Sequence, residues 1–343
     1  MGGGTSFPRE PLDRNKVVIV TGGNTGIGYE TAKWIAMLGA KVIIACRSED
    51  KALEAIKRMK EEYATEKQKG TKGIIQDGDI DVTFMQVDLA SLQSTKKFIE
   101  NFKSSGQKLH TLVCNAGLGF LPLQMTEDGN ELVFQTNYLS QFLICVHLIP
   151  LMESSGSDDC RIIMVSSSVH DFAPPFDISK VQGKDLKPSS YDEAGYYAYS
   201  KLYQVMQMYF MNKRLKDTNV SILSIHPGVV KTEFQRNFDK SGACCITSIV
   251  KCFICCGCAR NAFQGAETEI YTAIAPELKG IRDVYYIDCK PKTTASQSRN
   301  TENQEALLKL SLELLKDYIP DSKNNVKSSD WSSKLKKREM NVL

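Results

Sequence analysis

The sequence predicts a single α/β domain built on a doubly wound, mostly parallel β-sheet with helices on both faces. Residues 17–20 are four consecutive β-favouring apolar residues, which predict a strand buried on both faces. A glycine-rich turn, Thr21-Gly22-x-x-x-Gly26-x-Gly28, follows this strand with no spacer, and residues 30–38 then favour a helix. Further strands and helices alternate along the chain, which is typical of a parallel sheet.

The glycine-rich turn predicts an anion site. Glycines let the backbone approach a phosphate, while the unpaired N–H groups and the dipole of the following helix face it. A dinucleotide is the expected ligand, because a strand, a glycine turn and a helix N-terminus form the Rossmann-type cofactor site. The spacing is Gly-x-x-x-Gly-x-Gly, which differs from the ordinary Gly-x-Gly-x-x-Gly fingerprint but places glycines in the same kind of strand-to-helix turn. From this motif alone, a merely structural turn stays an alternative.

Residues 41–46 predict a second buried strand, and Arg47 stands at its end, 19 residues after Gly28. An acidic residue near this place would hold the ribose 2′-hydroxyl of NAD(H), whereas an arginine accommodates the 2′-phosphate of NADP(H). The sequence therefore favours NADP(H). Glu49 and Asp50 follow closely and leave NAD(H) open.

The remaining segments continue the alternation. Strands are predicted at residues 82–87, 109–114, 161–165, 220–225 and 284–287, and helices at 51–62, 91–102, 195–215, 264–275 and 305–318. The charged, glycine-containing stretch that ends near residue 81 predicts a surface loop. Together these segments indicate one domain over residues 14–320, preceded by a flexible segment 1–13 and followed by a disordered polar tail 321–343.

Composition narrows the class of protein. The chain has 343 residues, 42% hydrophobic and 24% charged, which suffices for one large core. A net charge of +3 without a concentrated basic face argues against a nucleic-acid partner. Eleven cysteines without a signal peptide predict reduced thiols in a cytosol-facing protein. No run reaches the roughly 18 apolar residues of a spanning helix, so we expect a protein that is soluble or rests on a membrane surface.

A series of motifs resembles the short-chain dehydrogenase/reductase superfamily over residues 14–320. In chain order they are the glycine turn, Asp88, Asn115-Ala116-Gly117, Asn137, Ser167, Tyr197-x-x-x-Lys201 and Pro227-Gly228. Each motif is weak by itself, but their common order makes chance resemblance negligible. Within the superfamily, the closer likeness is to retinol dehydrogenases and to the catalytic domain of the WW-domain-containing oxidoreductase, through Ala45-Cys46-Arg47, Phe134-Gln135-Thr136-Asn137, His226-Pro227-Gly228 and Gln264-Gly265-Ala266.

Carbonyl reduction requires a proton for the developing alkoxide, and a tyrosine can supply it when a lysine one helical turn away favours its phenolate. Tyr197 and Lys201 have this i, i+4 spacing. The neighbouring Tyr196 and Tyr199 lack a lysine four residues later. The resemblance therefore implies Tyr197 as the proton donor and Lys201 as its partner.

The resemblance completes a catalytic tetrad with Ser167 and Asn137. It selects Ser167, from the three serines at 166–168, as the hydroxyl that binds the substrate oxygen. Ser166 or Ser168 is expected to bond the turn backbone instead. The Asn137 backbone is implied to hold a water that relays protons to Lys201, and a plain exposed helical asparagine is the alternative.

The resemblance also implies which residues contact the cofactor. They are Gly22, Asn24, Thr25, Gly26, Ile27, Gly28, Arg47, Asp88, Leu89, Asn115, Ala116, Gly117, Tyr197, Lys201, Val229 and Thr232. Among them, the Val229 backbone and the Thr232 hydroxyl are expected against the nicotinamide carboxamide. His226 is expected to be a packed strand-end residue, and we expect no metal.

Residues 244–275 are expected to form a lid over a lipophilic substrate, with residues 172–191 as a loop beside it. Residues 244–258 hold six of the eleven cysteines. A zinc site at Cys252 and Cys255 is conceivable, but a paired motif and histidines are missing. The segment could instead lie in a bilayer interface and carry palmitate.

The amino terminus adds a second membrane signal. Gly2, with a hydroxyl residue at Ser6, fits the N-myristoylation pattern, and a disordered glycine-rich start is the alternative. A peripheral location on an intracellular membrane, facing the cytosol, is therefore one expectation, and a cytoplasmic protein is the other.

We expect an NADP(H)-dependent oxidoreductase that interconverts a lipophilic alcohol and its carbonyl, with retinol and retinal as the best guess. A steroid or quinone carbonyl reductase is an alternative, since pocket loops rather than the fold set specificity. A weakly active, cofactor-binding regulatory protein is another. The oligomeric state is undetermined, and a homo-oligomer fits.

Overall fold

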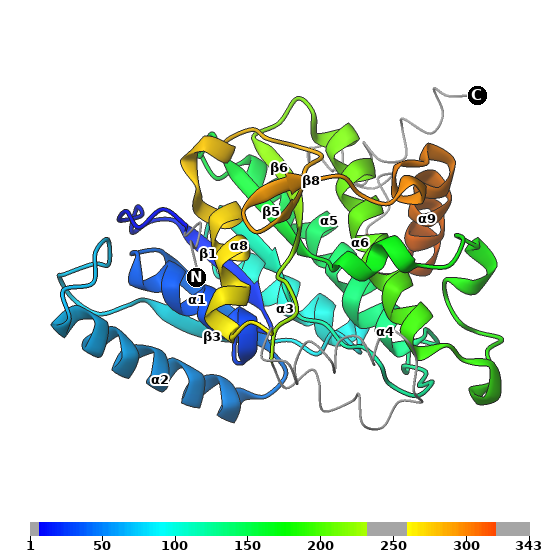
Figure 1. Cartoon of the computed structure of the whole chain (residues 1–343), viewed down its shortest axis with the longest axis horizontal. Helices are drawn as coiled ribbons and strands as arrows, with labels where there is room; N and C mark the ends of the chain where they lie inside the picture. Colours follow the sequence, from blue (N-terminus) through cyan, green and yellow to red (C-terminus); the bar gives the residue numbers. More distant parts are fainter. Residues whose placement is uncertain (1–6, 232–258, 320–343) are drawn as a thin grey trace.

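The computed structural model describes residues 7–231 and 259–319 of the chain (Figure 1). Its centre is one sheet in the order β3-β2-β1-β4-β5-β6-β7-β8. The strands are β1 (Val17–Thr21), β2 (Lys41–Cys46), β3 (Val82–Gln86), β4 (Thr111–Cys114), β5 (Cys160–Val165), β6 (Val220–His226), β7 (Tyr285–Ile287) and β8 (Lys290–Lys292). Neighbouring strands run parallel up to β7, and β8 pairs with β7 antiparallel. The predicted single α/β domain with a doubly wound, mostly parallel sheet is confirmed.

Helices cover both faces of this sheet (Figure 1). They are α1 (Gly26–Met37), α2 (Glu49–Gln68), α3 (Leu92–Ser104), α4 (Leu132–Phe134), α5 (Ser140–Glu153), α6 (Glu193–Leu215), α8 (Ala262–Ile274) and α9 (Thr301–Leu314). Helices α1, α2 and α8 pack on one face with Val18 and Val20, whereas α3, α5, α6 and α9 pack on the other with Val17 and Ile19. Successive strand residues point to opposite faces, so β1 is apolar throughout because both of its faces are covered.

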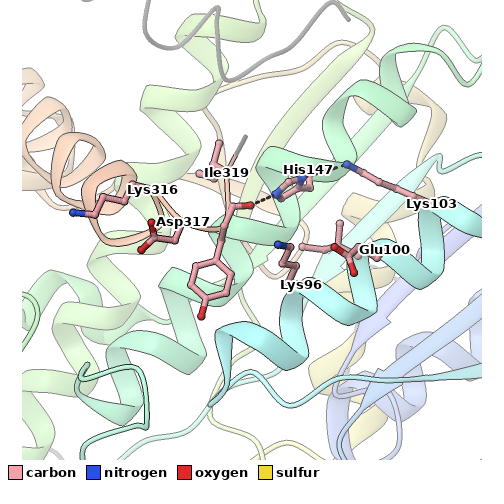
Figure 2. Close-up of a pocket in the computed structure, with 9 residues that line it drawn as sticks. Lys96, Glu100, Lys103, His147, Lys316, Asp317 and Ile319 are labelled. Atoms are coloured by element: carbon pink, nitrogen blue, oxygen red, sulfur yellow. Dashed lines mark hydrogen bonds between the residues drawn. The ribbon is translucent and has the colours of Figure 1, made fainter. Parts of the chain in front are cut away.

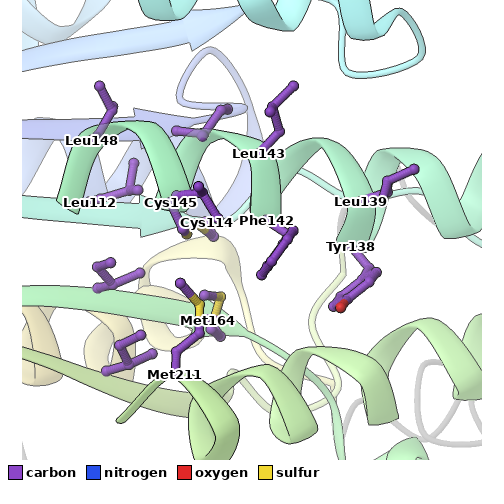
Figure 3. Packing of buried hydrophobic residues seen from close by; sticks show 14 of the residues in the cluster. Leu112, Cys114, Tyr138, Leu139, Phe142, Leu143, Cys145, Leu148, Met164 and Met211 are labelled. Carbon is purple, nitrogen blue, oxygen red and sulfur yellow. Dashed lines mark hydrogen bonds between the residues drawn. The ribbon is translucent and has the colours of Figure 1, made fainter. Parts of the chain in front are cut away.

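Helix α5 lies in the centre of its layer, where Phe142 and Cys145 pack in one cluster with Leu112 and Cys114 of β4 (Figure 3). The continuous helical segment Leu132–Glu153 is long and apolar enough, by length and composition, to cross a membrane. However, 89% of its apolar window is buried inside the fold. Its place in the core accounts for its composition, because a helix enclosed by other elements is apolar all round.

Helix α2 is longer than the sequence pattern predicted. It continues past residue 62 to Gln68, through the first part of the stretch expected as a surface loop. Met59 and Tyr63 are buried on one side of this helix, and the Tyr63 hydroxyl donates a hydrogen bond of 2.9 Å to the Ile75 carbonyl oxygen. This hydrogen bond attaches the charged loop that follows α2 to the helix.

The edge strand β8 was not predicted. Asp288 and Cys289 both have positive φ angles, 54° and 58°, and form a tight turn between β7 and β8. The sequence did not predict this turn because Asp-Cys is not the usual hairpin signal, which is Asn-Gly or Asp-Gly. It did not predict the strand because β8 has only three residues, all exposed, and one of them is Pro291. Proline is tolerated there because an edge strand need not donate every backbone hydrogen bond.

The amino-terminal segment packs against the domain from Phe7 onward, in contrast to the expectation of a flexible segment 1–13. The Phe7 ring is buried, 5.5 Å from the Trp34 ring and 6.2 Å from the Phe263 ring. The Leu12 amide donates a 2.7 Å hydrogen bond to the Leu38 carbonyl oxygen. Burial of an aromatic side chain against α1 and α8 outweighs the absence of regular structure in this segment.

Candidate active site

The glycine-rich turn lies at the carboxyl end of β1 and permits a very close approach of two backbone segments. Gly22 has a φ angle of +66°, which glycine adopts without strain. A Cβ atom on Gly28 would lie 2.3 Å from Asn115 Nδ2. The Asn115 amide therefore occupies space that any other residue at position 28 would fill.

Helix α1 begins at Gly26, inside the turn and earlier than the predicted residue 30. Within the described part of the chain, the side chain of the preceding Thr25 makes no capping hydrogen bond, and the first turn of α1 contains no acidic residue. Asn24 and Ile27 are half-buried beside it. The first N–H groups of α1 are thus available to an anion, and the cradle fits the pyrophosphate of a dinucleotide.

Asn115, Ala116 and Gly117 close the cradle from the carboxyl end of β4. Asn115 Nδ2 donates to the Thr21 carbonyl oxygen at 2.8 Å, and the Ala116 amide donates to Thr21 Oγ1 at 3.0 Å. Gln141 Nε2, from α5, donates to the Ala116 carbonyl oxygen at 3.1 Å. Sequence reasoning missed Gln141, although a buried glutamine in an otherwise apolar helix is a visible signal of a required hydrogen bond.

Arg47 and Asp88 follow the neighbouring strands β2 and β3, at the same edge of the sheet as the glycine turn. Arg47 is exposed, and its carbonyl oxygen accepts a hydrogen bond of 3.2 Å from Gln86 Nε2. Asp88 Oδ1 accepts from the Ala90 amide at 3.0 Å, and the buried Leu89 follows it. The structure therefore gathers these three predicted cofactor residues along the edge where the parallel strands end.

Tyr197 lies in the first half of α6 with its side chain buried. Its ring is 4.9 Å from that of Phe120. Burial raises the pKa of Tyr197, and a hydrogen bond with the Ser167 side chain partly offsets this rise. The sequence argument expected the nearby lysine to favour the phenolate, but loss of water dominates in the structure, so Tyr197 carries its proton at neutral pH.

Lys201 lies one helical turn after Tyr197, with Nζ 5.6 Å from the centre of the Tyr197 ring. Nζ donates to the Val165 carbonyl oxygen at 2.8 Å and to Gln204 Oε1 at 3.1 Å. Burial lowers the pKa of Lys201 to about 7. The predicted i, i+4 pair therefore faces one side of α6, beside the carboxyl end of β5.

The two competing tyrosines have other hydrogen-bond partners. The Tyr196 hydroxyl donates to the Lys180 carbonyl oxygen at 3.2 Å, and the Tyr199 hydroxyl donates to the Pro175 carbonyl oxygen at 3.0 Å. Both acceptors belong to the predicted loop 172–191. These tyrosines attach the loop to α6, which leaves Tyr197 as the tyrosine that reaches Ser167.

The three serines after β5 have separate partners. Ser166 Oγ donates to the Lys201 carbonyl oxygen at 2.7 Å, and Ser168 Oγ lies 3.3 Å from His226 Nε2. Ser167 Oγ accepts from the Val169 amide at 3.3 Å and also bonds to Tyr197. The serine selected by resemblance is thus the one that meets the buried phenol, and its neighbours support the helix and strand around it.

Asn137 lies in a short π-helix, Gln135–Leu139, between α4 and α5, and it is fully buried. This burial excludes the alternative of an exposed helical asparagine. Asn137 Nδ2 donates to the Leu118 carbonyl oxygen at 2.8 Å and to Ser200 Oγ at 2.9 Å. Its backbone carbonyl oxygen accepts from Gln204 Nε2 at 3.0 Å. A widened helical turn exposes backbone groups, and here it directs one toward α6.

Comparison with known proteins shows the family of this chain. A family model described as short chain dehydrogenase matches residues 16–177. Retinol dehydrogenase 12 from Mus musculus is 34% identical over 301 residues, which cover 88% of this chain and 86% of that protein. The chain belongs to the short-chain dehydrogenase family.

Other relatives in the short-chain dehydrogenase family are similar over most of the chain. The WW domain-containing oxidoreductase of Homo sapiens is 34% identical over 310 residues, 89% of this chain and 69% of that protein. Polyprenol dehydrogenase of Homo sapiens is 32% identical over 317 residues, 91% of this chain and 88% of that protein. The family uses NAD(P)H.

Solved structures show the same fold at lower sequence identity. An uncharacterised protein from Mycobacterium paratuberculosis has a TM-score of 0.67 and 22% identity, covering 91% of this chain and 98% of that chain. Actinorhodin polyketide ketoreductase, solved with NADPH, has a TM-score of 0.57 and 17% identity, covering 80% and 96%. These two structures and the present one share the arrangement of sheet and helices.

The carboxyl end of β6 contributes the last described part of the site. His226 has its pKa lowered to about 4 by burial and by Arg260, so it is neutral, in line with a packed strand-end residue. The Val229 carbonyl oxygen accepts from the Arg260 amide at 2.8 Å. Two predicted parts of the site lie outside the described residues: Thr232, and the cysteine-rich residues 244–258 with which the expected lid begins.

A pocket of 520 Å³ lies away from these residues, between α3, α5 and the end of α9 (Figure 2). Lys103 Nζ donates to His147 Nδ1 at 3.2 Å, and His147 Nε2 donates to the Tyr318 carbonyl oxygen at 2.9 Å. None of its lining residues belongs to the tetrad. Within residues 7–231 and 259–319, no group of three or more His, Cys, Asp or Glu side chains is arranged to hold a metal ion.

Proposed function

We propose that this short-chain dehydrogenase is an NADP(H)-dependent oxidoreductase that interconverts a lipophilic alcohol and its carbonyl, with retinol and retinal as the leading substrate class. The observation that carries the proposal is the buried Tyr197, bonded to Ser167 and flanked by Lys201. A buried acid beside a hydroxyl and a cation is suited to stabilise and protonate a developing alkoxide.

The chain's own residues divide the work of carbonyl reduction. When bound along the cradle, NADPH would supply a hydride to the carbonyl carbon. Tyr197 gives its phenolic proton to the carbonyl oxygen, and Ser167 donates a hydrogen bond to the same oxygen. Lys201, charged below its pKa of about 7, stabilises the negative charge that this transfer leaves on Tyr197.

Two observations support a lipophilic substrate. Relatives that cover most of the chain are named retinol dehydrogenase 12 and polyprenol dehydrogenase. Phe172, five residues after Ser167, keeps 71% of its surface exposed. It ends the short 3-10 helix that follows the catalytic serine, and a large exposed aromatic side chain in this segment is suited to contact an apolar ligand.

The test is the oxidation of NADPH by purified protein in the presence of retinal, a polyprenal, a steroid ketone, a quinone or a short fatty aldehyde, followed by the absorbance of NADPH. The highest kcat/KM is expected with retinal. A preference for the steroid or the quinone would change the substrate class. Cofactor binding without turnover of any of these compounds would favour a regulatory protein.

Arg47 is proposed to determine the choice between NADP(H) and NAD(H). Its guanidinium can pair with the 2′-phosphate through charge-assisted hydrogen bonds, which a carboxylate would repel. Arg47→Asp should therefore shift the ratio of kcat/KM values toward NADH. Measuring both cofactors with one substrate checks this, and an unchanged ratio would remove Arg47 from the cofactor site. Lys51→Asp makes the same charge change nearby on α2 and is the matched control.

We also propose that the protein is held on a cytosol-facing membrane without spanning it. A myristoyl chain on Gly2 would bind only marginally, so a second signal is needed, and residues 244–258 could provide it through palmitate and apolar side chains. The basic residues at 334–338 would add attraction to anionic lipid. Wild type should sediment with membranes, whereas Gly2→Ala and a variant with the six clustered cysteines changed to serine should become soluble. Wholly soluble wild-type protein would overturn this proposal.

A further inference from the structure

Gln204 connects two members of the tetrad. It lies on α6, three residues after Lys201, and is fully buried. Its Oε1 accepts a hydrogen bond of 3.1 Å from Lys201 Nζ, and its Nε2 donates one of 3.0 Å to the Asn137 carbonyl oxygen. An ammonium group only donates and a carbonyl oxygen only accepts, so one orientation of the amide satisfies both partners.

Lys201 depends on this contact because it is a buried cation. Its described acceptors are Gln204 Oε1 and the Val165 carbonyl oxygen, and each favours the ammonium form over the neutral amine. On another side of the ammonium group, a Cβ atom on Gly117 would lie 3.5 Å from Nζ. The two acceptors therefore hold Nζ close to the segment that closes the cofactor cradle.

A primary amide does not ionise near neutral pH. Gln204 therefore holds Lys201 Nζ in place without adding a charge, while the Asn137 carbonyl oxygen holds Gln204. The acidic group that raises the pKa of Lys201, against the effect of burial, is the buried Glu269 of α8, which substitutions of Gln204 leave unchanged. These contacts explain the role of the π-helix Gln135–Leu139. Its widened turn directs the Asn137 carbonyl group toward Gln204 of α6.

We propose that Gln204 is a positioning residue of the reaction, which ties Lys201 to the Asn137 carbonyl oxygen and keeps it in the ammonium form beside Tyr197. This inference rests on the proposed function and deepens it. The sequence motifs did not indicate the contact between Gln204 and Asn137, because the two residues are 67 positions apart in the chain.

The test compares two substitutions with opposite expected effects. In wild type, kcat/KM for carbonyl reduction should fall as the pH rises past the pKa of Lys201. Gln204→Leu removes the acceptor, so this fall should move to lower pH by about one unit. Gln204→Glu places a carboxylate beside the ammonium, so the fall should move to higher pH.

Gln207→Leu is the matched control, because Gln207 is also buried on α6 and its Nε2 donates to Met211 Sδ, away from the tetrad. It should lower the melting temperature as Gln204→Leu does, but leave the pH profile in place. Profiles that coincide for Gln204→Leu, Gln204→Glu and Gln207→Leu would overturn the inference. The pH dependence of NADPH dissociation, measured by fluorescence, should show the same opposite shifts without turnover. If wild type neither binds nor oxidises NADPH, the proposed function fails; if it does both and the profiles coincide, the positioning role alone fails.

Discussion

Tyr197→Phe is expected to lower kcat for carbonyl reduction by about 100-fold or more, while the dissociation constant of NADPH stays near that of wild type. The substitution removes one hydroxyl from a buried ring and leaves its contact with Phe120 in place. The proton donor is lost, and Ser167 keeps its bond to the Val169 amide. Single-turnover kinetics with a carbonyl substrate, together with NADPH titration by fluorescence, measure the two quantities separately.

Tyr199→Phe is the control for this prediction. It removes a hydroxyl from the same helix, but that hydroxyl bonds to the Pro175 carbonyl oxygen in the neighbouring loop. We expect it to retain most of the turnover and to alter KM instead, because the loop is held less firmly. If Tyr199→Phe abolished turnover and Tyr197→Phe did not, the acid would be Tyr199.

Lys201→Ala is expected to lower kcat/KM by about 100-fold or more and to weaken NADPH binding as well. The substitution removes the positive charge that lies 5.6 Å from the Tyr197 ring centre. It also leaves the Val165 carbonyl oxygen and Gln204 Oε1 buried without this donor. Steady-state kinetics and NADPH titration check both effects.

The pH dependence of carbonyl reduction follows from the direction in which the pKa of Lys201 is shifted. Burial lowers the pKa of Lys201 to about 7, so the ammonium form is complete at acidic pH and is lost as the pH rises through neutrality. Wild-type kcat/KM for reduction should decline over that range, and the decline should be absent in Lys201→Ala. Lys201→Met, which fills a similar volume without a charge, should behave like Lys201→Ala. A decline that persists in both variants would assign it to another group.

Strands β1 to β7 could be predicted from local patterns in the sequence, whereas the edge strand β8 could not. The Tyr197–Lys201 pair could be predicted from its spacing together with the resemblance to the short-chain dehydrogenase/reductase superfamily. Four apolar residues in succession mark β1, and a spacing of four marks one side of a helix. The exact start of α1 could not be predicted, since Gly26 begins the helix despite a low helix propensity. The turn around it is closed by the contact of Gly22 and Gly28 with Asn115, which follows the distant strand β4.

The electrostatics of the site could not be predicted from spacing. The sequence suggested that Lys201 would lower the pKa of Tyr197, and that statement assumes a charge interaction without loss of water. Both groups are buried, so desolvation raises the pKa of Tyr197 and lowers that of Lys201. Burial results from packing by the whole chain, and no pattern of nearby residues contains it.

The loop beside the active site is attached to its surroundings through its own backbone. The carbonyl oxygens of Ala173, Pro175 and Lys180 accept hydrogen bonds from Gln297, Tyr199 and Tyr196, which all lie outside the loop. A backbone carbonyl group is present whatever side chain the residue carries. The exposed side chains of this loop can therefore be exchanged while these backbone attachments persist. The buried Val181 and the side chains of Gln182 and Tyr191, which bond to residues 129–131, must be kept. A library randomised at the exposed positions would sample new substrate preferences on an unchanged catalytic helix.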